Sequence, residues 1–209
     1  MSAEGDLTID LVPTQLVAPR LRRIAAIAVV VGVVVALLAG AATTWPVGIV
    51  AGAVVGGPTA VAALLSMRRR TWLTGTVVRS RRLLRTRHVD LAAAQTAELT
   101  VRSGRISQIS LKIGDGNRSA AVPLALYTDT GGRELEVLGL RRLADGLAAG
   151  ELVAAAALSS VLVEQLRAEA RGAGIDERPL YRAVRLVRDS GRASFTTLSD
   201  AEVAALLEA

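Results

Sequence analysis

Two apolar stretches decide the fold: IAAIAVVVGVVVALLAGAA at residues 24–42 and VGIVAGAVVGGPTAVAALLSM at residues 47–67. Neither stretch contains an ionisable side chain, and only four residues, TTWP, separate them. As helices they would span roughly 28 and 31 Å, close to the ~30 Å hydrocarbon core of a bilayer. A soluble helix of this length normally keeps one polar stripe, and both stretches lack one. The sequence therefore predicts a transmembrane helical hairpin over residues 20–70.

Arginines flank the outer ends of this hairpin and are missing from its turn. Because short cytoplasmic flanks are enriched in basic residues, this pattern predicts a multi-pass protein of the inner membrane with both termini in the cytoplasm. A cleaved signal peptide is the alternative for the first stretch, and it would place the following domain on the other side. The length of the stretch and the acid-containing segment before it disfavour cleavage. The flanking arginines are Arg20, Arg22, Arg23, Arg68, Arg69 and Arg70.

Small residues recur at every fourth position on both predicted helices. Such spacing places them on one helix face, where two backbones can approach closely in lipid. The face could pack the hairpin on itself, which we favour, or it could form a homodimer or dock a partner. Too few polar residues lie at depth to predict a transport pathway. The small residues are Gly32, Ala36 and Gly40 on the first helix, and Gly48, Gly52 and Gly56 on the second.

The remainder of the chain is long enough for one small domain. The protein has 209 residues and no cysteine, which excludes disulfides and thiolate metal sites. Residues 1–19 mix acids, prolines and isolated apolar residues, and we expect a mostly disordered cytoplasmic arm with a short strand or turn at residues 7–12. No cofactor motif is present: phosphate-binding loops, dinucleotide fingerprints and clustered zinc ligands are all missing from the sequence.

Residues 71–172 are predicted to form a β-rich cytoplasmic domain with a closing helix. Alternating apolar residues indicate five or six short strands, in an antiparallel sheet or a half-open barrel. Pro123 favours an edge or a bulge. We expect Leu135 and Val137 to point inward from a last strand, with Glu134 and Glu136 on a solvated face. Helices are predicted at residues 140–149 and 151–171. A helical tail, residues 173–209, follows with one helix at residues 179–189 and a capping box at residues 199–202.

The single histidine, His88, lies two residues before Asp90. Such a pair can belong to a catalytic triad or a metal site, but no nucleophile motif or second histidine accompanies it. We therefore predict a structural or exposed histidine and no enzyme. A membrane-associated enzyme around this pair is the most disfavoured of the hypotheses for function.

A basic cluster follows the second apolar stretch. Its first three arginines are accounted for by the predicted orientation of the hairpin in the membrane, and the others could form a solvated edge of the sheet. The functional hypothesis is contact with anionic lipid headgroups, to which each basic residue contributes on the order of 1 kcal/mol. Nucleic acid is disfavoured because interleaved aromatic residues are missing. The proposed headgroup contacts are Arg68, Arg69, Arg70, Arg79, Arg81, Arg82, Arg85 and Arg87.

The layout resembles small bacterial two-span membrane proteins with a pleckstrin-homology-like cytoplasmic domain. The residues that carry the resemblance are RRRTW at 68–72, RTRHVDLA at 85–92 and the helical region 140–171. The resemblance implies a half-open barrel plugged by a helix and acting as a binding or scaffolding module. The usual glycine-rich passage between the middle strands is not evident, and the tail after residue 172 has no counterpart.

Two functions compete on these observations. The first is a non-catalytic integral membrane protein that presents a cytoplasmic binding or scaffold domain to a partner protein or to anionic lipid headgroups. The second is an accessory subunit of a larger membrane complex, which docks through the glycine-rich transmembrane face.

Overall fold

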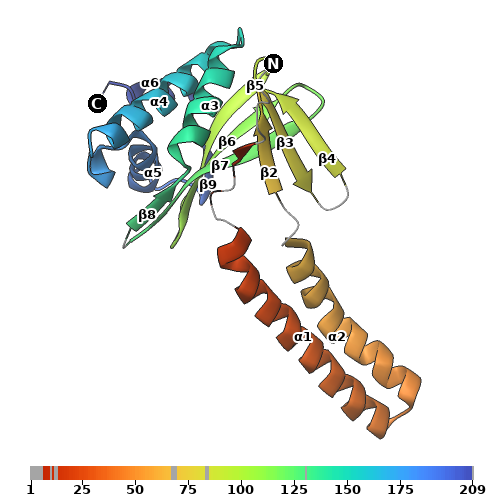
Figure 1. Ribbon diagram of the computed structural model, residues 1–209. Coiled ribbons are helices and arrows are strands. Elements are labelled where there is room, and N and C mark those ends of the chain that lie inside the picture. The colour runs from red at the N-terminus through yellow and green to blue at the C-terminus, as the bar shows by residue number, and fades with distance from the viewer. Residues whose placement is uncertain are drawn as a thin grey trace. The chain divides into compact units, whose positions relative to one another are not determined.

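The computed structural model describes residues 7–9, 11, 14–66, 70–82, 85–129 and 131–208 (Figure 1). The chain forms two compact units, a helical hairpin and a mixed domain of strands and helices. The predicted order of elements is confirmed at this level, because two apolar helices precede antiparallel sheets and C-terminal helices.

The hairpin consists of α1 (Thr14–Ala42) and α2 (Trp45–Ser66). Each contains a stretch that is long and apolar enough to cross a membrane, Arg22–Ala42 and Trp45–Ala62. Only 6% and 22% of these stretches are buried, whereas the core helix of a soluble protein would be mostly buried.

The helical bounds differ from the predicted ones at two places. The helix α1 begins ten residues before the predicted apolar stretch and includes its flanking arginines. The link to α2 is only Thr43 and Thr44, because Trp45 and Pro46 already belong to the first turn of the second helix. Proline is well tolerated there, since the first turn of a helix leaves its amide groups unpaired in any case.

Nine strands in the described part of the chain form two antiparallel sheets, which do not close into a barrel. The strand orders are β1-β2-β3-β4 and β8-β7-β6-β5-β9. The strands are β1 (Leu7–Thr8), β2 (Arg70–Thr74), β3 (Val77–Arg82), β4 (Arg85–Asp90), β5 (Thr96–Arg102), β6 (Ser107–Gly114), β7 (Ser119–Thr128), β8 (Gly131–Glu134) and β9 (Phe195–Thr197).

The strand number exceeds the predicted five or six partly because residues 70–82 form a hairpin of two strands. A turn at Gly75, whose φ is +58°, separates β2 from β3. The register sets Leu73 opposite Val78, and both are fully buried, whereas Val77 is only half-buried. The turn at Gly75 thus places Val78, and not its neighbour Val77, on the inward face.

The middle strands follow the predicted alternation. Ile109, Leu111 and Ile113 of β6 are all buried. The register between β6 and β7 shifts after Ile109, so that the next residue, Ser110, pairs with Pro123. The predicted bulge at this proline is confirmed, since a residue without an amide hydrogen suits an interrupted ladder.

The last predicted strand is shorter than expected. The strand β8 ends at Glu134, and the helix α3 (Val137–Ala148) begins three residues later. Leu135 is buried as predicted, but Val137 is 50% exposed on the first turn of α3. The expected alternation stops here because the backbone changes from extended to helical.

The remaining helices gather at one side of the mixed domain in Figure 1. The helix α4 packs against α3, α5, α6 and β5. One continuous core joins the helices to both sheets. The helices are α4 (Val153–Ala170), α5 (Pro179–Asp189) and α6 (Asp200–Ala205), with a short 3-10 helix η1 (Ile175–Glu177) before α5.

Both ends of the chain belong to this domain, which corrects two predicted boundaries. In the arm expected to be flexible, β1 pairs with β2, and Ile9 and Leu11 are buried in the core. In the segment expected to be a separate tail, β9 pairs with β5, and the core includes Leu180 and Val187 of α5. The last segment therefore completes the domain that begins at β1.

Candidate functional site

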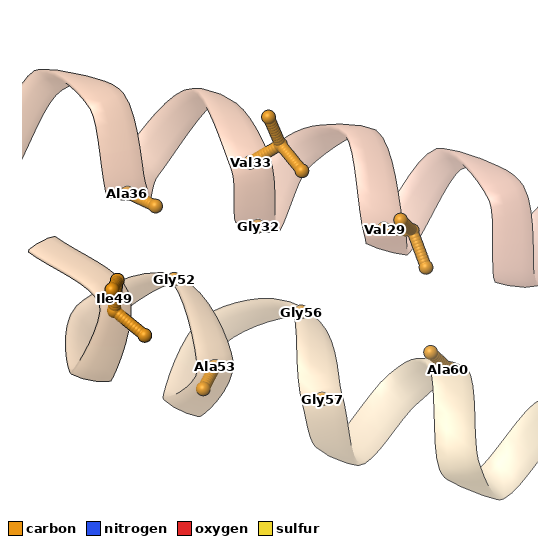
Figure 2. A pocket seen from close by; sticks show the side chains of 10 residues that line it. All are labelled: Val29, Gly32, Val33, Ala36, Ile49, Gly52, Ala53, Gly56, Gly57 and Ala60. Atoms are coloured by element: carbon orange, nitrogen blue, oxygen red, sulfur yellow. The ribbon is translucent and has the colours of Figure 1, made fainter.

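The glycines of the hairpin lie where α1 and α2 touch. A Cβ atom on Gly52 would be 2.4 Å from the carbonyl oxygen of Gly32, and one on Gly48 would be 2.3 Å from that of Ala36. A Cβ on Gly56 would be 2.6 Å from the carbonyl oxygen of Ala28. Figure 2 shows Gly32 and Ala36 on the side of α1 that faces Gly52 and Gly56 on α2. The glycine stripe of α2 is thus covered by α1 of the same chain.

The sixth small residue of the two predicted stripes has a different neighbour. Gly40 lies beside the indole of Trp45, whose Cε3 atom would be 3.1 Å from a Cβ on this glycine. Trp45 itself is 61% exposed at the start of α2. The close helix contact therefore extends from the turn to the middle of both helices.

An open groove runs along one side of this contact. It has a volume of about 280 Å³, and its lining contains no charged side chain. Gly57 borders the groove, and a Cβ on it would meet no atom within 4 Å outside its chain neighbours. Only apolar groups, such as acyl chains or another helix, would suit this surface. The ten lining residues, labelled in Figure 2, are Val29, Gly32, Val33, Ala36, Ile49, Gly52, Ala53, Gly56, Gly57 and Ala60.

The structure places part of the predicted basic cluster on the first sheet. The register of β2 and β3 sets Arg70 opposite Arg81, and Trp72 opposite Arg79. Arg79 is exposed. The positions 82, 85 and 87 lie on β3 and β4, whereas positions 68 and 69 lie outside the described residues.

His88 and Asp90 lie two residues apart on β4. His88 is exposed on β4. The carboxylate of Asp90 accepts a hydrogen bond of 3.0 Å from the backbone amide of Ala92 and so stabilises the turn after the strand. Within the described ranges, no three histidine or acidic residues are grouped closely enough to hold a metal ion.

A polar cluster that the sequence did not predict surrounds Glu134. Its side chain is only 10% exposed, which corrects the expected solvated face. One carboxylate oxygen accepts from Gln165 Nε2 at 2.9 Å and from Arg178 Nη1 at 2.6 Å, and the other accepts from the Tyr127 hydroxyl. Glu136, two residues later, is exposed as expected. The two acids differ because the strand ends between them.

The same cluster ties two helices to the second sheet. Gln165 is fully buried on α4, and its carbonyl oxygen accepts from the backbone amide of Leu180 at 3.1 Å. Arg178 also donates to the carbonyl oxygen of Ala173 at 3.2 Å. Every one of these groups has a protein partner, so the cluster can hold α4 and α5 against β8.

Burial raises the pKa of Tyr127, and the neighbouring Glu134 carboxylate raises it further. The phenol therefore stays neutral and acts as a hydrogen-bond donor. Its ring packs edge-on against Tyr181, with the ring centroids 5.1 Å apart and an interplanar angle of 75°. The ring packing and a Glu134 carboxylate whose two oxygens both accept protein hydrogen bonds give this cluster a structural role.

A cavity of about 330 Å³ opens beside the cluster. Acidic and basic side chains both line it, and Glu169 Oε2 is a buried oxygen with no protein hydrogen-bond donor among the residues described. A donor group such as a water molecule or an amine would suit that oxygen. The lining residues are Tyr127, Gly132, Arg133, Glu134, Leu135, Glu136, Glu169, Ile175 and Arg178.

No local signal in the sequence could have revealed this cluster. Gln165 and Arg178 are 31 and 44 residues from Glu134 along the chain. No family model matches the chain, and neither a curated protein nor a solved structure shows significant similarity to it.

Proposed function

We propose that the protein is a two-span anchor of the inner membrane that presents a non-catalytic binding domain to the cytoplasm. The observation that carries this proposal is the outer surface of the hairpin. Large apolar side chains stand exposed along both helices, among them Leu38 at 68%, Val54 at 67% and Ile27 at 63% exposure. Water would penalise a continuous apolar surface of this size, whereas a bilayer would solvate it.

The orientation rests on the arginines at the outer ends of the hairpin. Their absence from the two-residue link, Thr43 and Thr44, favours a cytoplasmic location for both termini and for the mixed domain. Too few polar residues lie at depth in the hairpin to form a pathway for a transported solute. The hairpin then serves as an anchor.

The ligand of the domain is a partner protein or anionic lipid headgroups. The concentration of arginines at residues 68–87 supports a negatively charged ligand, since basic residues are attracted to anionic headgroups. Two antiparallel sheets followed by helices also support the pleckstrin-homology-like resemblance and its half-open barrel, both of which stay proposals.

Docking of a larger complex through the glycine face is the less favoured alternative. Gly48, Gly52 and Gly56 already contact α1, so a partner helix would have to displace it or use the groove beside Gly57. The same groove is the surface available to a homodimer.

Labelling of single cysteines tests the anchor and its orientation, because the chain has no cysteine of its own. In intact spheroplasts, a membrane-impermeant maleimide should label Thr44→Cys in the link. It should label Glu208→Cys, near the C-terminus, only after the membrane is permeabilised. An N-terminal tag should remain on the protein, which should stay with the membrane in alkaline carbonate.

The proposal fails if carbonate releases the protein, or if Glu208→Cys is labelled from outside. Loss of the N-terminal tag together with outside labelling of Glu208→Cys would instead support a cleaved signal peptide.

A further inference from the structure

We propose that the turn between β5 and β6, together with the start of β9, is a second membrane-contact site that binds the phosphate of anionic phospholipids. This inference deepens the proposed function and rests on it. It concerns a surface separate in sequence from the basic cluster at residues 68–87.

A polar cavity marks this surface. It has a volume of about 410 Å³, and its lining contains two arginines and no acidic residue. Arg102 and Arg105 are both exposed, and neither forms an ion pair within the described part of the chain. The lining residues are Arg102, Ser103, Gly104, Arg105, Ile106, Gln108 and Ser194.

The two chain segments that form the cavity are held together by backbone contacts. Ser103 donates its amide hydrogen to the carbonyl oxygen of Ser194 at 2.9 Å. The register of β5 and β9 sets Arg102 opposite Phe195, and the register of β5 and β6 sets it opposite Gln108. Residues directly opposed in an antiparallel sheet point to the same face, so Arg102 lies between an aromatic and a polar side chain.

A third arginine lies near this edge without lining the cavity. Arg188, at the end of α5, donates to the hydroxyl of Ser107 at 3.3 Å. Asp189 follows it but does not line the cavity, and Glu202 is already paired with Arg192 at 2.5 Å. The local charge therefore favours an anion. Guanidinium groups and serine hydroxyls are suitable donors for the oxygens of a phosphate.

Two large, exposed apolar side chains indicate that the phosphate belongs to a lipid surface. Ile106 in the turn is 58% exposed, and Phe195 at the start of β9 is 63% exposed. Inorganic phosphate would gain nothing from them. A bilayer would bury them at the headgroup boundary while the arginines meet the phosphates.

The test uses the full-length protein in nanodiscs. Ile106→Cys supplies a single site for nitrobenzoxadiazole, whose emission shifts to the blue in an apolar environment. Val153→Cys, at an 82% exposed position outside the surface, is the control for the label position. Nanodiscs of phosphatidylcholine are compared with nanodiscs that contain phosphatidylglycerol as well.

We expect a blue shift, and quenching by brominated lipid, only for the label at position 106 and only with phosphatidylglycerol. The double variant Arg102→Gln/Arg105→Gln should lower the equilibrium constant for docking of this surface on the bilayer about 30-fold. Each arginine near an anionic surface raises that constant about fivefold. The matched variant Arg118→Gln/Arg141→Gln removes two exposed arginines elsewhere and should keep the shift.

Three results would overturn the inference. One is an unshifted label in phosphatidylglycerol nanodiscs. Another is an equal loss of docking in both double variants. The third is a response to inorganic phosphate at constant ionic strength without a response to phosphatidylglycerol, which would show a site for soluble phosphate compounds. A protein that cannot be integrated into nanodiscs would refute the proposed function and this inference together, whereas an integrated protein with an unshifted label refutes only the inference.

Discussion

Substitution of Gly52 by leucine should force the two helices of the hairpin apart. The first added atom, Cβ, would lie 2.4 Å from the carbonyl oxygen of Gly32 and 2.7 Å from Ala36 Cβ. The nearer separation is about 1 Å shorter than ordinary contact of roughly 3.5 Å. The oxygen belongs to the backbone of α1, so no side-chain rotation can make room.

The expected cost follows from this geometry. Extra methylene groups in a packed interior typically cost about 1–3 kcal/mol, and four added carbons against backbone atoms should cost at least about 3 kcal/mol. The higher helix propensity of leucine offsets less than about 1 kcal/mol of that. The free energy of association of the two helices should therefore fall by at least about 2 kcal/mol.

Pyrene excimer emission can follow the separation of the helices. Cysteines at Ile24 and Ala62, near the outer ends of the apolar stretches of α1 and α2, would carry the labels in an otherwise cysteine-free chain. The protein in dodecylmaltoside micelles is titrated with dodecyl sulfate. Gly52→Leu should lose excimer emission at a lower mole fraction of dodecyl sulfate than its parent.

Ala53→Leu is the matched control, because it introduces the same side chain at the adjacent, exposed position. It should behave like the parent. Equal transitions for Gly52→Leu and Ala53→Leu would refute the idea that close backbone contact at the glycines holds the hairpin together.

Two further predictions concern the mixed domain, each measured by chemical denaturation of the full-length protein in detergent. Glu134→Gln should lower the free energy of unfolding by about 2 kcal/mol, because it weakens the charged hydrogen bonds to Arg178 and Gln165. Glu136→Gln, the control, should leave the free energy of unfolding unchanged. Equal effects of the two substitutions would contradict the role of the buried cluster. A hydrogen bond from Arg192 and, as the next largest cause, one from the Ser199 amide lower the pKa of Glu202 to about 2. The stability that these bonds add to the folded protein is fully present above the unfolded pKa near 4.5 and is lost as the pH falls toward 2. The stability difference between the parent and Glu202→Gln should therefore be larger at pH 7 than at pH 3, and a constant difference would argue against the lowered pKa.

The correct expectations came from features that depend on neighbours in the chain. The apolar helices follow from runs of uncharged residues, and the bulge at Pro123 follows from its missing amide hydrogen. The capping box at Ser199 and Glu202 is confirmed because both halves lie within one turn of helix. Each of these signals can be read within a window of a few residues or from one continuous stretch.

The errors came from contacts between distant segments. An alternating pattern could not show that the strand ends at Glu134, nor that this acid meets Arg178 from beyond the expected domain boundary. The apolar face of α5 was visible in the sequence, but its packing partners on α4 and β5 were not. The short strands β1 and β9 form only because longer strands offer them an open edge.

The sequence by itself determined that two uncharged helices form, because hydrophobic length and charge placement are properties of a continuous stretch. It also determined where glycines allow close approach. Only the tertiary structure decided what meets those glycines, since a helix face has no partner until a second helix packs on it. The structure likewise decided that Arg102 of β5 lies opposite Phe195 of β9, although the two residues are 93 positions apart in the chain. Such pairings depend on the whole topology, because side chains far apart in the chain become neighbours only when the sheet has formed.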